Sequence, residues 1–311
     1  MNKFYKVSFI IAGCMVCIGL MLGVVGGVFG GSHDLINMIQ QGDLNWNGGS
    51  FYPQFDDWDD DEESDNQEAS GENSEIEQMN GDWKIITKNV VFSADNINSL
   101  SIAVGGAKLQ VEPYDGDQIK IEVKNENKYQ YCLKNETLFI RSKEEATNRR
   151  MIKLYIPRNK AFEQIDMKLG AGMIDADSLK CNSMNAKVGA GHVELSNVTA
   201  QKMKLKIGAG EAQLSDVDFG ESQMIIEMGS IDFDGKINGN TSIDCAMGSV
   251  DMDLEGSENA FNYQIECSAG SVDVGDNAIS GLGSEKNIDN GSAHDFSITC
   301  NMGSVICNFN E

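Results

Sequence analysis

A motif that returns about every 20 residues limits this chain to a small set of architectures. Residues 165–172 read Ile-Asp-Met-Lys-Leu-Gly-Ala-Gly, and similar octapeptides occupy 184–191 and 203–210. Four later copies carry Met-Gly-Ser or Ala-Gly-Ser instead, at residues 228–230, 247–249, 269–271 and 302–304. The motifs end at residues 172, 191, 210, 230, 249, 271 and 304, so the steps are 19, 19, 20, 19, 22 and 33 residues. A nearly fixed period of this length is typical of stacked repeats.

Apolar and polar residues alternate with a period of two around each motif, which indicates β-strands rather than helices. Because glycine lacks a Cβ atom and adopts positive φ at little cost, the glycines predict a sharp corner between two strands. After the corner a second strand alternates in the same way, as Ile174 and Ala176 do. The inward positions expected before the corners are Ile165, Met167, Leu169, Met184, Ala186, Val188, Met203, Leu205, Ile207, Met224, Ile226, Met228, Ile243, Cys245, Met247, Ile265, Cys267, Ala269, Ile298, Cys300 and Met302.

One such unit of strand, corner and strand cannot bury its apolar face alone. Stacked units share a dry core between two facing sheets, and equivalent strands then run in the same direction. We therefore expect an all-β fold, a flattened, largely parallel β-solenoid of two sheets with a period of about 19–20 residues. An antiparallel sandwich with regular spacing is the alternative fold.

Residues 1–31 have the composition of a membrane anchor. Lys3 and Lys6 precede an uncharged run of 25 residues from Val7 to Gly31, which is long enough to cross a bilayer roughly 30 Å thick. The two lysines are expected on the cytoplasmic side, so the rest of this single-pass protein would lie outside the cytoplasm. A cleaved signal peptide and a lipoprotein modified at Cys14 are the alternatives.

Residues 32–80 predict a disordered acidic linker. No Lys or Arg occurs between Ser32 and Trp83, and residues 59–63 are five consecutive acidic residues. Such a segment cannot bury enough apolar surface to fold, and its charges repel one another. We interpret it as a spacer, with a tract that binds cations or a partner as the alternative. The net charge of the whole chain is −24, which argues against nucleic-acid binding by bulk electrostatics.

The remaining chain divides into a β cap region at residues 81–160 and the solenoid repeats at residues 161–311. Residues 104–111 read as a degenerate copy of the repeat, and terminal repeats are atypical because they cap the stack. Residues 276–295 are rich in Gly, Ser and Asn and lengthen the last interval, so they are expected to form a loop.

Leu154-Tyr155-Ile156-Pro157, followed by the array of Gly-Ala-Gly and Met-Gly-Ser corners, resembles the bacterial β-strand-repeat adhesin family, a family of unknown function. The resemblance covers about residues 84–309 and suggests a membrane-anchored member. It implies the repeat fold, a membrane-anchored or secreted location, and for some members a link to envelope-stress regulation. It supplies no catalytic residues.

Three cysteines, Cys245, Cys267 and Cys300, fall at the same inward position of successive copies, and Cys307 also alternates inward. Stacked strands lie about 4.8 Å apart, within disulfide range, and disulfides form outside the cytoplasm. We interpret these cysteines as small buried apolar side chains, with a disulfide as the alternative. Zinc is not expected, because no Cys-x-x-Cys pair outside the predicted anchor and no histidine cluster is present.

Carboxylates recur on the outward face of the second strand of each unit. Asp232, Asp251 and Asp273 would lie one above another if the copies stack in register, with Asp234 and Asp253 two residues further on. At the strand spacing each neighbouring pair costs about 1 kcal/mol in water. These five residues are the candidate Ca²⁺ ligands, because Ca²⁺ takes several carboxylate oxygens. We interpret the row as a solvated acidic face, since the nonapeptide repeat of calcium-binding β-rolls is absent, with Ca²⁺ binding as the alternative.

Catalytic motifs are absent: the sequence has no Gly-x-Ser-x-Gly, no His-Glu-x-x-His and no phosphate-binding loop. We therefore expect a non-enzymatic, membrane-anchored extracytoplasmic protein that serves as an adhesin or as a cell-envelope interaction or stress-response module. Its expected partners are the membrane, cell-envelope polymers and surface proteins. A Ca²⁺-binding surface scaffold and a carbohydrate-active β-helix enzyme are the alternatives.

Overall fold

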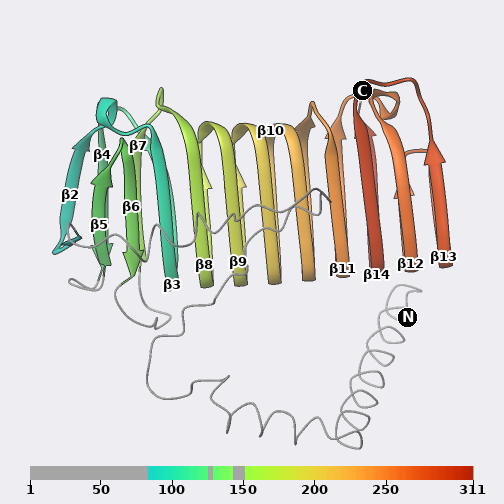
Figure 1. Ribbon diagram of the computed structural model, residues 1–311, viewed down its shortest axis with the longest axis horizontal. Coiled ribbons are helices and arrows are strands. Elements are labelled where there is room, and N and C mark those ends of the chain that lie inside the picture. The colour runs from blue at the N-terminus through green and yellow to red at the C-terminus, as the bar shows by residue number, and fades with distance from the viewer. Residues whose placement is uncertain (1–82, 125–128, 143–150, 311) are drawn as a thin grey trace, which may run out of the picture. The chain divides into compact units, whose positions relative to one another are not determined.

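The computed structural model describes residues 83–124, 129–142 and 151–310, and these residues form a long row of β-strands (Figure 1). The strands are β1 (Lys84–Ile85), β2 (Asn89–Ser93), β3 (Ser99–Tyr114), β4 (Gln118–Lys124), β5 (Tyr129–Lys134), β6 (Thr137–Ser142), β7 (Met151–Pro157), β8 (Ala161–Asp177), β9 (Lys180–Ser196), β10 (Thr199–Ile237), β11 (Thr241–Glu255), β12 (Asn262–Val274), β13 (Asn277–Ile288) and β14 (Asp295–Asn310). Two short 3₁₀ turns, η1 (Ala94–Asn96) and η2 (Glu258–Ala260), accompany them. The predicted all-β class is confirmed.

The predicted anchor at residues 1–31 and linker at residues 32–80 lie outside the described residues. Among the residues that the structure describes, no helix is long and apolar enough to cross a membrane.

The middle of the row is a stack of parallel strands held in register. Met167 of β8 pairs with Ala186 of β9, and Ala186 pairs with Leu205 of β10, so the step is 19 residues. Parallel pairing continues from β10 to β11 and from β11 to β14. The strands form one open path from β1 to β13, and the sheet does not close on itself.

Each long strand bends at a glycine, so that its two arms line a common core. In β8, Leu169 before the bend and Ile174 after it are both fully buried and belong to the same hydrophobic cluster. Gly172 has a φ of +129°, and a Cβ atom there would overlap the carbonyl oxygen of Ala107 on the neighbouring strand. Stacked bends therefore require glycine for both its conformation and its small size. Each Ile or Leu buried in this core contributes about 1.5–3 kcal/mol.

The glycines at the bends of successive strands stack on one another, and this stacking shows how the copies of the sequence motif align. Gly210 is followed in the column by Gly229 and then Gly248, all with positive φ, so the step stays at 19 residues where the motif ends suggested 20. The second glycine of Gly-Ala-Gly thus matches the single glycine of Met-Gly-Ser. The methionine before that glycine moves to the outside of the corner. The expectation that Met228, Met247 and Met302 face inward was wrong: their exposed fractions are 54%, 43% and 53%.

The end of the chain does not follow the sequence order. β14 lies between β11 and β12, in parallel register with both, so the last repeat is inserted into the stack rather than added to its end. The expected loop at residues 276–295 was also wrong. Residues 277–288 form β13, which pairs antiparallel with β12 and is the outermost strand. Glycines and serines hide the alternation of β13 in the sequence, while the 33-residue interval gives the chain room to form a hairpin.

The N-terminal strands end the parallel stack in a different way. β3 pairs in parallel with β8 over residues 99–111, which confirms that residues 104–111 belong to a degenerate copy of the repeat. β6 and β7 pair in parallel with the two arms of β3. Beyond them β5 pairs antiparallel with β6, and β4 pairs antiparallel with β7. The short strand β1 then pairs with β5, and the short strand β2 pairs with β4.

Candidate binding surface

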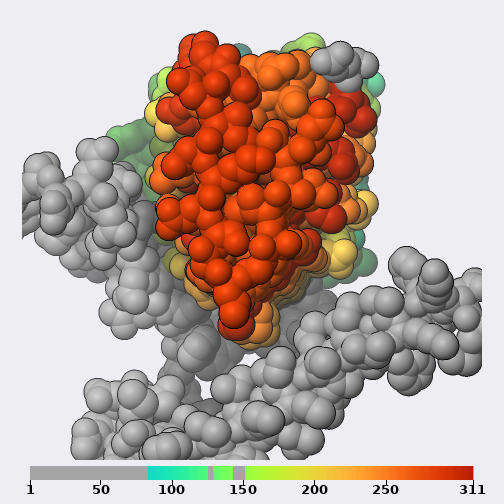
Figure 2. All heavy atoms as spheres, turned by 90° about the vertical axis from the view of Figure 1, so that its right-hand side faces the viewer, coloured from blue at the N-terminus to red at the C-terminus, as the bar shows by residue number. Residues whose placement is uncertain are grey.

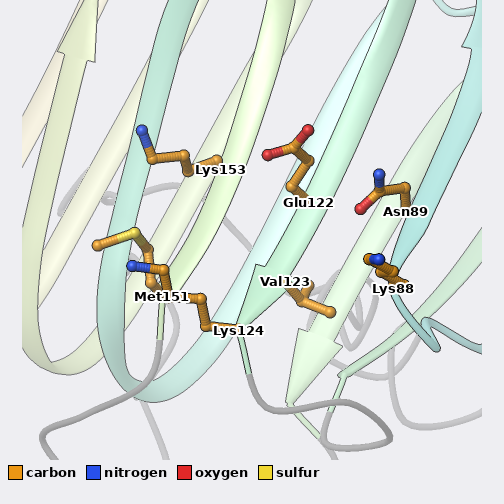
Figure 3. Close-up of a pocket in the computed structure, with 7 residues that line it drawn as sticks. All are labelled: Lys88, Asn89, Glu122, Val123, Lys124, Met151 and Lys153. Carbon is orange, nitrogen blue, oxygen red and sulfur yellow. The ribbon is translucent and has the colours of Figure 1, made fainter.

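A hollow of about 260 Å³ lies among the N-terminal strands (Figure 3). Its lining residues are Lys88, Asn89, Glu122, Val123, Lys124, Met151 and Lys153. Lys153 donates a hydrogen bond of 3.0 Å from Nζ to Oε1 of Glu112, and this bond raises the pKa of the lysine. The hydroxyl of Tyr155 donates to Glu122 at 3.3 Å, and burial raises the pKa of that tyrosine. Lys153 and Glu122 of the hollow are thus held in structural bonds.

The row of outward aspartates predicted from the sequence, the acidic row, has a different order in the structure. Asp232 lies beside Asp251, as predicted, and Asp234 lies beside Asp253. The inserted strand β14 places Ile306 between Asp251 and Asp273, so the expected stack of three aspartates was wrong. The same insertion places Asn308 beside Asp253, and its side-chain amide donates a 3.0 Å hydrogen bond to that carboxylate. The five candidate Ca²⁺ ligands therefore do not form one continuous ladder.

Metal-binding geometry is absent from the described part of the chain. No group of three or more His, Cys, Asp or Glu side chains is placed there to hold a metal ion. Calcium binding by Asp232, Asp234, Asp251, Asp253 and Asp273 stays a prediction from the sequence.

The predicted row of inward cysteines is present, but the insertion of β14 changes the order of its members. Cys300 lies between Cys245 and Cys267, and all three side chains are at most 2% exposed. The six cysteines within the described ranges are free thiols. Burial raises the pKa of Cys300 to about 12, so it stays protonated at neutral pH. The thiols fill the core as small apolar groups, which agrees with our interpretation of the sequence.

The exposed methionines form a ridge along the outside of the corners. Met247 lies beside Met302, Met302 beside Ala269, and Ala269 beside Leu282 of β13. Met228 adjoins Met247, because the glycines that follow them are paired. We call Met228, Met247, Met302, Ala269 and Leu282 the corner ridge. Leu282 has the largest exposed fraction, 88%. With strands about 4.8 Å apart, the corner ridge is about 20 Å long.

The corner ridge lies in the acidic part of the protein. Residues 161–311 contain 8 Lys and Arg against 24 Asp and Glu, whereas residues 81–160 contain 14 against 10. At the corners before the ridge the equivalent positions carry Ala171, Ala190 and Ala209. Large apolar side chains at the corner are therefore confined to the C-terminal coils, where the charge around them is negative.

Sequence reasoning missed the corner ridge because it aligned the motifs by their last residues. A signal that identifies the frame was available. The first inward residue after each bend lies two positions beyond the bend glycine, as Ile174 follows Gly172 and Ile231 follows Gly229. Aligning the copies on these residues moves the methionines outside.

These features define an all-β repeat protein whose distinctive groups lie along its outer surface. The chain matches the Toastrack DUF4097 family over residues 97–275, which is more than half of its length. It therefore belongs to the Toastrack DUF4097 family, and the resemblance seen in the sequence is confirmed.

Three solved structures from bacteria are similar to the chain. A putative cell adhesion protein from Clostridium sporogenes is 12% identical, with 73% of this chain and 100% of that chain covered and a TM-score of 0.35. A putative adhesin from Bacteroides fragilis is 14% identical, with 72% and 97% covered and a TM-score of 0.39. A putative lipid binding protein from Parabacteroides distasonis is 15% identical, with 75% and 98% covered and a TM-score of 0.29. No curated protein matches the chain.

Proposed function

We propose that this protein is a non-enzymatic, membrane-anchored β-solenoid that binds a protein partner outside the cytoplasm, as an adhesin or a cell-envelope interaction module. The corner ridge is the observation that carries the proposal. Exposed, contiguous apolar groups on a soluble domain mark interaction sites, whereas single exposed apolar residues need no explanation. The ridge joins Met228, Met247 and Met302 on three successive strands and reaches Leu282 across Ala269, so it is a patch and not a scatter.

The side chains of the corner ridge suit contact with another protein surface. Methionine is unbranched and polarisable, so a row of methionines adapts to an irregular partner. The strands beneath the ridge are rigid, because each bend is fixed by glycines stacked on the neighbouring backbone. A ridge on such a scaffold enters a groove at little entropic cost.

Charge narrows the class of partner. Residues 161–311 carry three times as many acidic as basic residues, although Glu227, which is exposed beside Met228, forms a 2.9 Å ion pair with Lys206. A polyanionic envelope polymer or an anionic lipid surface would be repelled from the ridge. A protein with an apolar groove and a basic rim is complementary to it, and such complementarity also speeds association.

The N-terminal residues complete the proposal. An anchor at residues 1–31 would hold the protein in the cell membrane as a single-pass protein, and the acidic residues 32–80 would hold the strands away from the lipid. A stress-response role would use the same ridge to sense a partner. The Ca²⁺-binding scaffold remains the alternative function, because Asp232 and Asp251 are neighbours.

Attachment of beads that carry the full chain to intact bacterial cells tests the proposal. We expect the triple variant Met228→Ser, Met247→Ser, Met302→Ser to lower attachment at least about fivefold, because it removes most of the apolar area of the ridge. Treating the cells with protease should abolish attachment of the unmodified chain.

The matched control is the triple variant Ile85→Ser, Val91→Ser, Leu133→Ser. These three side chains are 42–48% exposed and lie among the N-terminal strands. Attachment of the control should equal that of the unmodified chain. Equal loss in both variants, or unchanged attachment of the methionine variant, would contradict the proposal.

A further inference from the structure

Among the strands that the structure describes, the outermost C-terminal strand, β13, has a partner on one side only. It pairs antiparallel with β12 from residue 277 to residue 288 and ends the row of described strands (Figure 1). Figure 2 views the array from this end, where the orange-red atoms around β13 face the viewer. The free side of such a strand presents unpaired backbone N–H and C=O groups, which are a template for pairing with another strand.

The core is incompletely covered at this end. Ile279 and Ile288 of β13 pack against the core but are only partly buried. Their neighbours on β12, Val272 and Tyr263, are 0% and 3% exposed. One more strand beyond β13 would cover the two isoleucines in the same way that β13 covers β12.

The composition of β13 does not prevent pairing. Natural edge strands are commonly blocked by proline, by several charges, by inward-pointing charged residues or by short length. Lys286 of β13 points inward, and its Nζ donates a 2.8 Å hydrogen bond to Oδ1 of Asn277 on the same strand. β13 has 12 residues and no proline, and its charged residues are Glu285 and Lys286, which cancel. A strand of zero net charge is therefore exposed at the end of a strongly acidic region, so another acidic chain can approach this edge with little repulsion.

We infer that two copies of this chain pair end to end through β13, in antiparallel register about a two-fold axis. β13 bends at its centre, where Gly281 and Gly283 have φ values of +118° and +65°. A two-fold axis through this bend places the first arm of one copy on the second arm of the other. The two strands then run antiparallel along both arms, which is the self-complementary contact that a symmetric dimer requires.

The alternation of inward and outward residues in β13 limits the registers in which two copies can pair. Asn277 and Ile279 face inward in the first arm, whereas Ser284, Lys286 and Ile288 do so in the second arm. For the core to continue across the interface, inward residues must pair with inward residues. Several registers meet this condition, and we take the one whose axis passes through the bend between residues 282 and 283, which places Ile279 beside Lys286 of the second copy.

Two consequences of this register support a second copy as the occupant. Glu285 lies beside Ser280 of the second copy, so no two like charges within β13 oppose each other; Asp276 and Asp289, which face each other in this register, flank the strand on either side. The two Leu282 side chains meet at the axis, and the corner ridges of the two copies join into one. The dimer does not depend on the proposed adhesive function, since pairing uses the backbone of β13 and attachment uses the methionines.

Cross-linking of the full chain, purified in detergent with its N-terminal residues, tests the pairing. A short bismaleimide should link Leu282→Cys into dimers. The two thiols would lie on neighbouring strands, one on each side of the two-fold axis, and therefore close together. Met228→Cys is the matched control: Met228 is 54% exposed on the same ridge but four strands away from the edge. It should form no more dimer than the unsubstituted chain, whose own cysteines set the background.

A second variant tests the register without cross-linking. Ser280→Asp places a carboxylate beside Glu285 of the second copy and should weaken dimerisation at least about tenfold in sedimentation, because like charges directly opposite repel. Ser249→Asp adds the same charge at an exposed position away from β13 and should leave dimerisation unchanged.

Three results would overturn the inference. They are a monomeric full chain at micromolar concentration, equal cross-linking of both cysteine variants, and equal effects of the two aspartate variants. A monomer in which β13 is protected by residues 1–82 of its own chain gives the first result. Failure of the unmodified, dimeric chain to attach to cells would instead contradict only the proposed function.

Discussion

The N-terminal and C-terminal ends of the row cover the same kind of core in different ways. At the N-terminal end Ile86 and Ile97 are fully buried, and the outer strands β1 and β2 have two and five residues. Trp83 also packs there, with the guanidinium carbon of Arg141 3.8 Å from its ring centroid. At the C-terminal end a 12-residue strand is unpaired on one side and its isoleucines are partly exposed.

The difference shows how a repeat protein separates stability from interaction. Short strands and a closed core end the stack without offering a long edge, which protects it from aggregation. The other end keeps a long edge of zero net charge beside the corner ridge. Function is therefore expected at the C-terminal end, while a capping role for the N-terminal end stays a prediction from the sequence.

Truncating one isoleucine at each end gives the largest contrast. Ile86→Ala should lower the free energy of unfolding by about 2–5 kcal/mol, because the cavity forms in a fully buried site. Ile288→Ala should cost about 1 kcal/mol or less in the monomer, because its side chain is already partly exposed. Urea unfolding measures both. Equal losses would mean that the C-terminal end is as closed as the N-terminal end.

The buried thiols of the C-terminal coils predict a pH effect of intermediate size. Burial raises the pKa of Cys300 from 9.0 to about 12 in the folded state, so the folded protein keeps a proton that the unfolded chain loses. The contribution of this thiol to the free energy of unfolding is therefore fully present below pH 9, and it is lost as the pH rises from 9 towards 12. The loss from Cys300 should be about 1 kcal/mol between pH 9 and 10.

Urea unfolding of the unmodified chain and of Cys300→Ala across pH 7–10 separates this contribution. The variant should lose less stability at high pH, although the substitution itself lowers stability at pH 7. Parallel curves for the two proteins would show that Cys300 does not titrate with the expected shift.

Calcium should have the smallest effect. Ile306 separates Asp251 from Asp273, and Asn308 holds Asp253 by a hydrogen bond, so the carboxylates on this surface are divided. We expect the melting midpoint of the full chain to respond to millimolar Ca²⁺ no more than to Mg²⁺, since both only screen the acidic face. A rise that is specific to Ca²⁺, and lost in Asp251→Asn, would restore the acidic row as a metal site.

Much of the parallel stack could be predicted, because its cause is local and repeated. The alternation around Leu169 and Ile174 gives the strands, and the glycines between them give the bend. The frame of the later motifs could not be obtained from the glycine motif alone, because Met-Gly-Ser and Gly-Ala-Gly place their bend glycine at different positions. Buried residues after the bend, such as Ile231, carry the missing information.

The periodicity of the sequence could not predict that β14 inserts between β11 and β12. Its residues match those of β11 and β12 equally well, so Cys300 fits beside either neighbour. The choice between adding the last strand and inserting it depends on the hairpin between β12 and β13, which occupies the outer edge first in the chain order. The break in the acidic row at Ile306 follows from that long-range arrangement, and so does the ridge from Met247 to Leu282.

Methionine oxidation of the full chain tests the central claim, that the corner ridge is an exposed contact surface, most directly. Brief treatment with peroxide followed by mass spectrometry measures the rate at each methionine. We predict that Met228, Met247 and Met302 oxidise at least about tenfold faster than the buried Met184 and Met203, and that attachment to cells slows only the first three. Equal rates for the two groups, or exposed methionines whose rates attachment leaves unchanged, would contradict the account.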